Sequence, residues 1–368
     1  MADFVIKPGA GVSNKLILKT QDATDVLTTS ASGVTITAPT LTGVTTAASL
    51  VLTPGSAPAT TEGAMYYDST DDVVKIRNAV AWEKINRGLA FGGTISSYTS
   101  GTDTYMVHTF LTSGQFITSK ALTVDYLVVA GGGGGGGKTS SFGCGGGGAG
   151  GFRTGTSFAV AVGSLNVIVG AGGARGQMTN GGVGTNGGDS TFSSITSNGG
   201  GYGGGDLNPG TAPNTGGSGG GGSRNTAAGA AGNTPSTSPS QGKNGGDRHP
   251  TGENGGGGGG AGANGEDASS NDSGGGFGGA GSTNDYRTGS NIYYAGGGGG
   301  GRGYGGSTSK DGGVGGVGGG GYGSTNADAR DGDHNTGGGG GGAGNATDPT
   351  REVGGHGGSG IVVIRYTI

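Results

Sequence analysis

The sequence lacks the residues on which several common protein functions depend. Its single cysteine, Cys144, excludes an internal disulfide, and no set of Cys and His residues has the spacing of a zinc site. Charged residues make up only 12% of the chain and the formal net charge is −4, so no clustered basic face for nucleic acid is visible. We therefore expect no metal site, no cofactor and no nucleic-acid partner.

Long apolar runs are also absent. No stretch approaches the ~20 apolar residues of a membrane helix, and the opening "MADFVIKPGAG" has no apolar core of signal-peptide length. We expect a protein that is made in the cytosol without a signal peptide and does not insert into a membrane. Amphipathic patterns of helix length are missing as well, which predicts essentially no α-helix.

Residues 1–62 read as short strands separated by turns. Apolar and polar residues alternate in 14–20, 33–39 and 48–55, which is the period of a half-buried strand. Large apolar groups are too few for such a segment to bury much surface alone. We expect three chains to associate here, so that each edge strand finds a partner. A small monomeric β-domain is the alternative.

Strand patterns continue as far as Ala130. Residues 64–67 and 73–77 flank a polar turn, and further strands are expected between residues 94 and 130. His108 stands alone in one of them and is expected to be structural. The β-branched C-terminus "IVVIRYTI" should pair with 123–130. The glycine-rich region between them would then begin and end at two neighbouring strands and would not be a free tail.

Glycine is what the sequence has in excess, with 101 of 368 residues, nearly all of them after Ala130. A flexible linker, a disordered low-complexity region and collagen are the ordinary interpretations of such a composition. Long uninterrupted runs break the Gly-X-Y rule of collagen, and the segments between runs carry Tyr, Arg, His, Asn and Asp. The runs of four or more glycines are 131–137, 145–148, 219–222, 255–260, 296–301, 318–321 and 337–342.

Within the mixed runs, the residues other than glycine recur every third position. Val314 and Val317 are three apart, as are Phe277 and Ala280. Three residues per turn is the period of a polyproline-II-type helix, on which every third side chain shares one edge. The glycine edges let backbones approach, so a non-glycine edge should mark an outer helix or a helix that faces another layer. Merging interrupted runs predicts about ten passes through a bundle of polyglycine-II helices.

One isolated run cannot be stable. Ordering a backbone residue costs roughly 1–2 kcal/mol, most for glycine, whereas a hydrogen bond returns about 0.5–1.5 kcal/mol net. Only a lattice in which each run bonds to several neighbours can hold these segments.

Residues 63–85, "GAMYYDSTDDVVKIRNAVAWEKI", resemble a small module of bacteriophage tail-fibre proteins. The sequence departs from that module at Ala79, where glycine is usual. The matching residues are Gly63, Met65, Tyr66, Tyr67, Asp68, Val74, Lys75, Ile76, Asn78 and Trp82.

Roughly residues 90–368 are similar to the glycine-rich modules of bacteriophage tail fibres and adhesins. The similarity lies in "LVVA" before the first glycine run, "SLNVIVGAGG", "GGDSTF" and the closing "GSGIVVIRYTI". It implies polyglycine-II helices that present variable loops to the host surface. The expected organisation is 1–62 for virion attachment, 63–88 as the tail-fibre module, 89–130 as strands packing on the glycine-rich domain, 131–360 as the helix bundle and 361–368 as the closing strand.

The resemblance implies a tail fibre or adhesin, located on the virion, and the thin N-terminal segment predicts a homotrimer. Its partners would be a host receptor, either a glycan or an outer-membrane protein, and other tail proteins bound through the N-terminus. A structural fibre subunit that binds no receptor is the alternative. No nucleophile–base pair or carboxylate pair is legible, so no enzyme is expected, and Asp331-Gly332-Asp333 falls short of a calcium loop.

Recognition residues should lie in the segments between the runs, because loops on a rigid scaffold concentrate binding functions. We expect them in 224–254, 282–295 and 324–336, where aromatic faces and arginine suit sugars or protein loops. Alternatively, the tyrosines cap the ends of the bundle. The candidates are Tyr286, Arg287, Tyr293, Tyr294, Arg248, His249, Arg330 and His334.

Overall fold

The computed structural model is all-β, as the sequence predicts, and the chain divides into two compact units, Met1–Arg87 and Gly88–Ile368. No α-helix occurs among the described residues, so none there could cross a membrane. The structure describes the strands within residues 7–84, and then 89–138, 142–177, 182–206, 211–224, 228–249, 253–269, 274–303, 312–325, 327–344 and 353–368.

The first unit contains two small antiparallel sheets. Strands form in the described parts of the expected segments 14–20, 33–39, 64–67 and 73–77, whereas 48–55 lies outside the described residues. One sheet orders β1 (Lys7–Pro8), β2 (Leu16–Lys19), β3 (Asp25–Ser30) and β4 (Gly33–Thr35), and the other β5 (Met65–Asp68), β6 (Val73–Arg77) and β7 (Trp82–Lys84).

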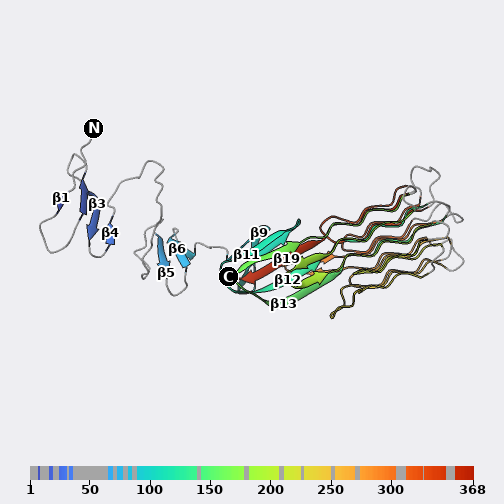
Figure 1. Ribbon diagram of the computed structural model, residues 1–368, viewed down its shortest axis with the longest axis horizontal. Helices are drawn as coiled ribbons and strands as arrows, with labels where there is room; N and C mark the ends of the chain where they lie inside the picture. Colours follow the sequence, from blue (N-terminus) through green and yellow to red (C-terminus); the bar gives the residue numbers. More distant parts are fainter. Residues whose placement is uncertain are drawn as a thin grey trace, which may run out of the picture. The chain divides into compact units, whose positions relative to one another are not determined.

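The second unit joins a β-sandwich to a glycine-rich domain (Figure 1). Strands of the sandwich come from both sides of residue 130. One sheet orders β13 (Phe152–Val160), β12 (Leu122–Val129), β19 (Ile361–Thr367), β10 (Asp103–Phe110) and β9 (Thr94–Ser100). The other orders β16 (Ile195–Ser197), β15 (Ser190–Phe192), β14 (Gly163–Ile168), β11 (Gly114–Thr118) and β8 (Ala90–Phe91).

The expected pairing of the two strands that bracket the glycine-rich region is confirmed. β12 and β19 are antiparallel neighbours, with Asp125 opposite Arg365 and Val129 opposite Ile361. Val128 packs in the core between the sheets, whereas Leu127 and Val129 pack in a second cluster on the opposite face. Burial on both faces explains why "LVVA" is a continuous apolar run and not an alternating one.

His108 lies in the core between the two sheets and is fully buried. Its ring meets Phe116 edge-on at 5.0 Å and stacks on Tyr366 at 5.8 Å. The Nδ1 atom lies 2.7 Å from the carbonyl oxygen of Gly92 and therefore carries the proton that it donates. His108 thus has the structural environment that its isolation in the sequence suggested, and burial lowers its pKa below the ordinary value.

This lowered pKa predicts that mild acid destabilises the sandwich. Unfolded histidine takes up a proton near pH 6.5 but buried His108 resists, so the unfolded chain binds more protons below that pH. Stability should be full above about pH 6.5 and fall as pH decreases through the folded pKa. Unfolding free energies between pH 5 and 7 should show a slope that His108→Gln reduces and His334→Gln, at an exposed position, leaves unchanged. An equal slope in both variants would contradict the assignment, and ring titration by NMR checks it in the unaltered chain.

The glycine-rich domain is a lattice of extended passes, and its first pass, 131–138, shows the repeat directly. Successive amides of Gly131, Gly132 and Gly133 donate to three different neighbouring passes. The next three amides return to the same three passes in the same order, which is the three-residue turn of a polyglycine-II helix. The acceptors in order are Gly188, Gly358, Gly148, Thr185, Gly355 and Gly145.

The carbonyls of the first pass bond to three further passes. Gly200, Gly173 and Gly340 donate to the carbonyls of Gly131, Gly132 and Gly133, at 2.8–3.0 Å. The pass is therefore enclosed by six neighbours, all of which bond to it through the backbone. This cross-linking is what the energetic argument requires, because no single run could hold its own order.

The passes that other passes surround on all sides are the ones that contain the long runs of glycine. Six of the long runs seen in the sequence lie in passes that bond to six neighbours each, because a side chain there would strike backbone on every side. The mixed run 312–317 lies at the periphery, and among the described passes it bonds to three, 274–281, 296–303 and 320–325. A mixed edge is not always at the surface, because Ala149 lies on a pass that bonds to six neighbours and is buried. The enclosed runs are 131–137, 145–148, 219–222, 255–260, 296–301 and 337–342.

The expected number of about ten passes was too low. The seventh run, 318–321, contributes a tight reversal in which Gly318 and Gly319 take φ of 98° and 95°, a conformation suited to glycine. Several polar segments are themselves passes. The described passes are 131–138, 143–151, 170–177, 182–188, 199–206, 211–216, 218–223, 228–232, 241–249, 253–260, 264–269, 274–281, 296–303, 312–317, 320–325, 327–333, 338–344 and 353–360.

Asparagine and aspartate side chains complete the hydrogen bonding at the lattice surface. Asp267 accepts from the amide of Asp247 at 2.7 Å, and Asp247 accepts from the amide of Gly229 at 2.8 Å. Asn264 and Asn244 repeat the pattern one turn away on the same passes. An outer pass has amides with no lattice partner, so these side chains supply the missing acceptors.

A hairpin from within the glycine-rich region covers the outer face of the sheet that contains β12 and β19. It consists of β17 (Ser282–Asn284) and β18 (Ile292–Tyr294), and Tyr286 and Tyr294 join the second apolar cluster with Leu127 and Val363. Arg365 of β19 holds it in place. The guanidinium lies 3.9 Å from the Tyr286 ring and bonds to Asp125 at 3.1 Å.

Candidate binding surface

A row of exposed side chains crosses four adjacent outer passes of the lattice. Its members are Phe277, Val314, Tyr322 and Arg330, and we call it the outer row. The amide of Gly278 donates to the carbonyl of Val314 at 2.8 Å, which places Phe277 and Val314 at about the same level. Backbone bonds from Gly323 to Gly313 and from Arg330 to Tyr322 carry that level across the next two passes.

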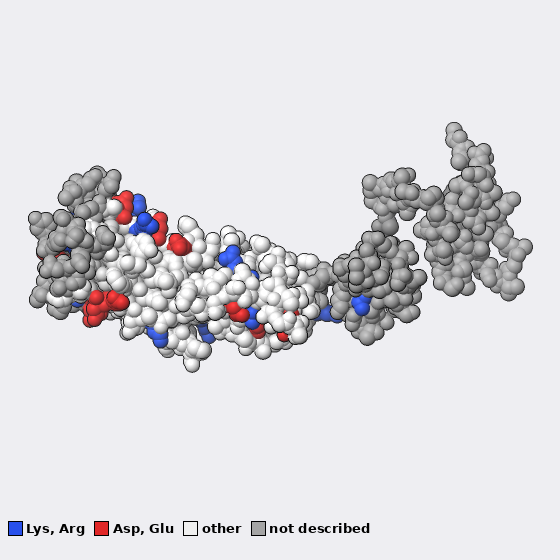
Figure 2. All heavy atoms as spheres, turned by 180° about the vertical axis from the view of Figure 1, so that it is seen from behind, with Lys and Arg blue, Asp and Glu red and all other residues white. Residues whose placement is uncertain are grey.

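The outer row is apolar at one end and cationic at the other. Phe277 and Val314 are each 47% exposed and Tyr322 is 44% exposed, with Val317 a turn away on the same pass as Val314. Elsewhere the exposed positions of the outer passes carry polar, small or charged residues, such as Asn244, Glu266 and His356. On the face seen in Figure 2, most of the lattice is uncharged and the charges gather toward the end away from the sandwich. A local cluster of exposed apolar groups on such a surface marks an interaction site.

Arg330 is the only sequence-predicted residue within the outer row. Its guanidinium carbon lies 5.3 Å from the centre of the Tyr322 ring, within the range of a cation–π contact. The side chain is exposed, and the structure gives it no ion pair with any described residue. The ring therefore orients a guanidinium whose hydrogen-bond donors remain available.

The structure corrects the expected role of Tyr286 and Tyr294. Their exposed fractions are 9% and 1%, and both pack between the hairpin and the sheet. Burial also raises the pKa of the Tyr294 hydroxyl. Neither ring has a free face for a receptor, so both act in packing.

Three other candidates lie near the sandwich end of the lattice. Tyr293 is 51% exposed, Arg287 is half-buried, and His334 is exposed in the turn that ends pass 327–333. The amide of Ala295 donates to the carbonyl of Thr336 at 2.8 Å, which brings that turn beside the hairpin.

Arg248 and His249 lie apart from these residues. Both are half-buried and end the pass 241–249. The pass begins beside the sandwich, where the carbonyl of Gln241 accepts the amide of Phe152, so its last residues lie at the opposite end. The predicted residues therefore do not form one site. The reason is that segments expected as display loops, 224–254 and 324–336, are largely lattice passes joined by tight turns.

Asp331 has a structural partner. Its Oδ1 atom accepts the amide of His356 at 2.7 Å, as at the other outer passes. Within the described ranges, no group of three or more His, Cys, Asp or Glu side chains is placed to hold a metal ion.

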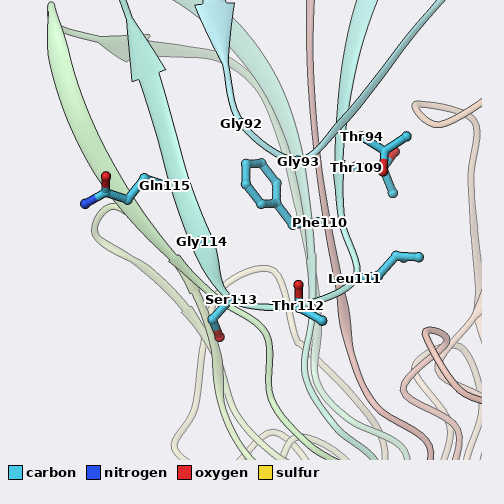
Figure 3. A pocket seen from close by; sticks show the side chains of 10 residues that line it. All are labelled: Gly92, Gly93, Thr94, Thr109, Phe110, Leu111, Thr112, Ser113, Gly114 and Gln115. Carbon is cyan, nitrogen blue, oxygen red and sulfur yellow. The ribbon is translucent and has the colours of Figure 1, made fainter.

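A small hollow of about 280 Å³ lies where the sandwich meets the lattice (Figure 3). The ring of Phe110 lies beneath Gly92 and Gly93, and Thr109, Thr112 and Gln115 contribute to the lining. Ligand pockets usually enclose about 300–1,000 Å³. The hollow is slightly smaller than that range, and none of its lining residues is a charged or titratable group that could act as a general acid or base.

Sequence reasoning missed Phe277, Val314 and Tyr322 as a surface. The three-residue spacing marked Phe277 and Val314 as outward-facing, but it cannot tell which passes are neighbours. Only the hydrogen bonds between passes reveal that these side chains share one level.

This architecture defines a class of protein, a β-sandwich that carries a polyglycine-II lattice. Residues 111–367 match the model of a protein family described as the glycine-rich domain, and this match covers more than half of the chain. The chain belongs to that family. A search of curated proteins returned no match.

Proposed function

We propose that this protein recognises a host cell surface as a bacteriophage tail fibre or adhesin. The observation that carries the proposal is the outer row, an exposed aromatic, apolar and cationic cluster on a lattice cross-linked by backbone hydrogen bonds. A rigid support favours recognition, because side chains held in place lose less entropy on binding. The tail-fibre-like residues 63–85 and the family match are consistent with this role.

The proposal includes the remaining partners. Residues 1–62 attach to other tail proteins of the virion, and three chains associate through their thin N-terminal sheets, whose short strands leave edges to be paired. The protein binds and does not catalyse. Light scattering of the full chain tests the trimer, which requires three times the 34.6 kDa of one chain.

Adhesion of the purified full chain to bacterial cells tests the function. We expect the labelled protein to bind a susceptible strain, and the triple variant Phe277→Ser, Val314→Ser, Tyr322→Ser to bind at least about tenfold more weakly, since a few anchoring side chains carry most of the binding energy of an interface. Phe91→Ser with Val162→Ser is the matched control, because these residues are exposed apolar side chains of the sandwich.

Two results would count against the proposal. If the unaltered protein binds no strain that the virion infects, the structural-fibre alternative holds. If the triple variant binds as well as the control, recognition does not use the outer row.

A further inference from the structure

The outer row combines two chemical features that a single ligand must match. Phe277, Val314 and Tyr322 present carbon surface, and Arg330 presents a planar fork of hydrogen-bond donors. Backbone hydrogen bonds fix the order of the four passes, so the apolar side chains lie on one side of the row and Arg330 lies at its end.

Arg330 is prepared for an anion. The contact with the Tyr322 ring orients the guanidinium, and no described carboxylate pairs with it. The neighbouring Asp331 already has its Oδ1 atom engaged by the amide of His356 on the next pass. A bidentate bond to a carboxylate or phosphate is the strongest interaction that such a fork makes.

The area of the row decides between kinds of partner. An aromatic side chain buries about 150–250 Å² in all, so four half-exposed side chains offer roughly 300–400 Å². A stable protein–protein interface needs about 800 Å² from each partner. The row is therefore too small for a folded protein but wide enough for a chain one or two units across.

We propose that the outer row binds an acidic glycan. Sugar rings have apolar C–H faces and polar edges, so successive rings can lie on Phe277, Val314 and Tyr322 while an acidic group reaches Arg330. Backbones joined by hydrogen bonds lie about 4.8 Å apart, as neighbouring strands do, and this spacing is close to the length of one sugar ring. This inference rests on the proposed function and names the receptor class for it.

Binding of the full chain to immobilised oligosaccharides tests the inference. The probes are an oligogalacturonate, its carboxyl-reduced neutral counterpart and a phosphorylated mannan oligosaccharide, so that carboxylate and phosphate are measured separately. We expect at least one acidic probe to bind tenfold or more tightly than the neutral one. Arg330→Gln should remove that preference, Arg330→Lys should restore part of it, and Phe277→Ser should weaken binding where Phe91→Ser does not.

Equal affinity for acidic and neutral probes, or no effect of Arg330→Gln, would overturn the inference, as would binding only to outer-membrane proteins in vesicles. The two proposals fail differently. Loss of cell adhesion in the triple variant together with unchanged adhesion in Arg330→Gln keeps host recognition and rejects the acidic glycan. Glycan binding without adhesion to any susceptible strain keeps the glycan site and rejects host recognition.

Discussion

Gly135→Ala should strongly destabilise the lattice. A Cβ atom at residue 135 would lie 1.9 Å from the carbonyl oxygen of Gly341 and 2.5 Å from its carbon. Relief requires the pass 338–344 to move, although it is itself bonded to six neighbours. Overpacking usually costs about 1–3 kcal/mol where the surroundings can shift. Here they cannot shift independently, so we expect a loss of more than about 4 kcal/mol.

Calorimetry and hydrogen exchange measure this loss. A domain of this size loses about 2–4 °C in Tm for each kcal/mol, so the transition should fall by about 10 °C or more. Amides of 131–137 should exchange slowly in the unaltered protein and rapidly in the variant. Prompt exchange in the unaltered protein would show that the runs are a flexible linker after all.

Gly114→Ala is the matched control for this substitution. Its Cβ would meet only the Phe110 ring, at 3.6 Å, which is an ordinary contact. Removing a glycine also restricts the unfolded chain, which stabilises by about 0.4–1 kcal/mol. We therefore expect no loss of stability. An equal Tm for both variants would contradict the close packing of the lattice.

Arg365→Met should release the hairpin 282–295 from the sandwich. The guanidinium lies between the rings of Tyr105, at 4.5 Å, and Tyr286, at 3.9 Å, and only 11% of the side chain is exposed. It bonds to Asp125 and lies 3.5 Å from a carboxylate oxygen of Asp285. Methionine preserves part of the volume but removes the charge and the donors.

We expect a loss of about 2–4 kcal/mol. Breaking a buried ion pair costs about 3–5 kcal/mol, and the cost is lower here because water reaches the partly exposed carboxylates. Amides of 282–295 should exchange faster, and tyrosine signals in near-UV circular dichroism should weaken. Arg330→Met makes the same replacement at an exposed position without an ion pair. A Tm unchanged by Arg365→Met would show that the aromatic cluster holds the hairpin without the cation.

Local patterns predicted the lattice well. The three-residue spacing at Val314 and Val317 reports backbone geometry, since a polyproline-II-type helix brings every third residue to one edge. The 3₁₀-helix has the same period but rarely exceeds three or four residues, and glycine disfavours it. The pairing of 123–130 with 361–368 was legible because both segments are β-branched and a chain that returns must close. The number of passes could not be predicted from the sequence. Outer passes such as 327–333 tolerate almost any side chain on their free edge, so their sequences resemble those of loops.

The candidate site was predicted less well. Tyr293 and Tyr294 are adjacent in sequence and both aromatic, but alternation along β18 sends one to solvent and the other into the cluster on the sheet. Sequence reasoning treated them alike. Arg330 was among the expected recognition residues and is exposed. Its partner Tyr322 was not among the candidates, because the two residues lie on different passes.

The sequence by itself determined the type of regular structure that the glycine-rich region forms. Runs of glycine interrupted at every third position require close-packed polyglycine-II helices, because no other regular structure of that period uses bare edges on two sides. Only the tertiary structure decided which passes are neighbours, and so which side chains meet. Polyglycine edges are all alike and carry no code for a partner; the order of the passes follows from the turns, the sandwich and the hairpin held by Arg365. Phe277, Val314, Tyr322 and Arg330 therefore become one surface only after the whole chain has packed.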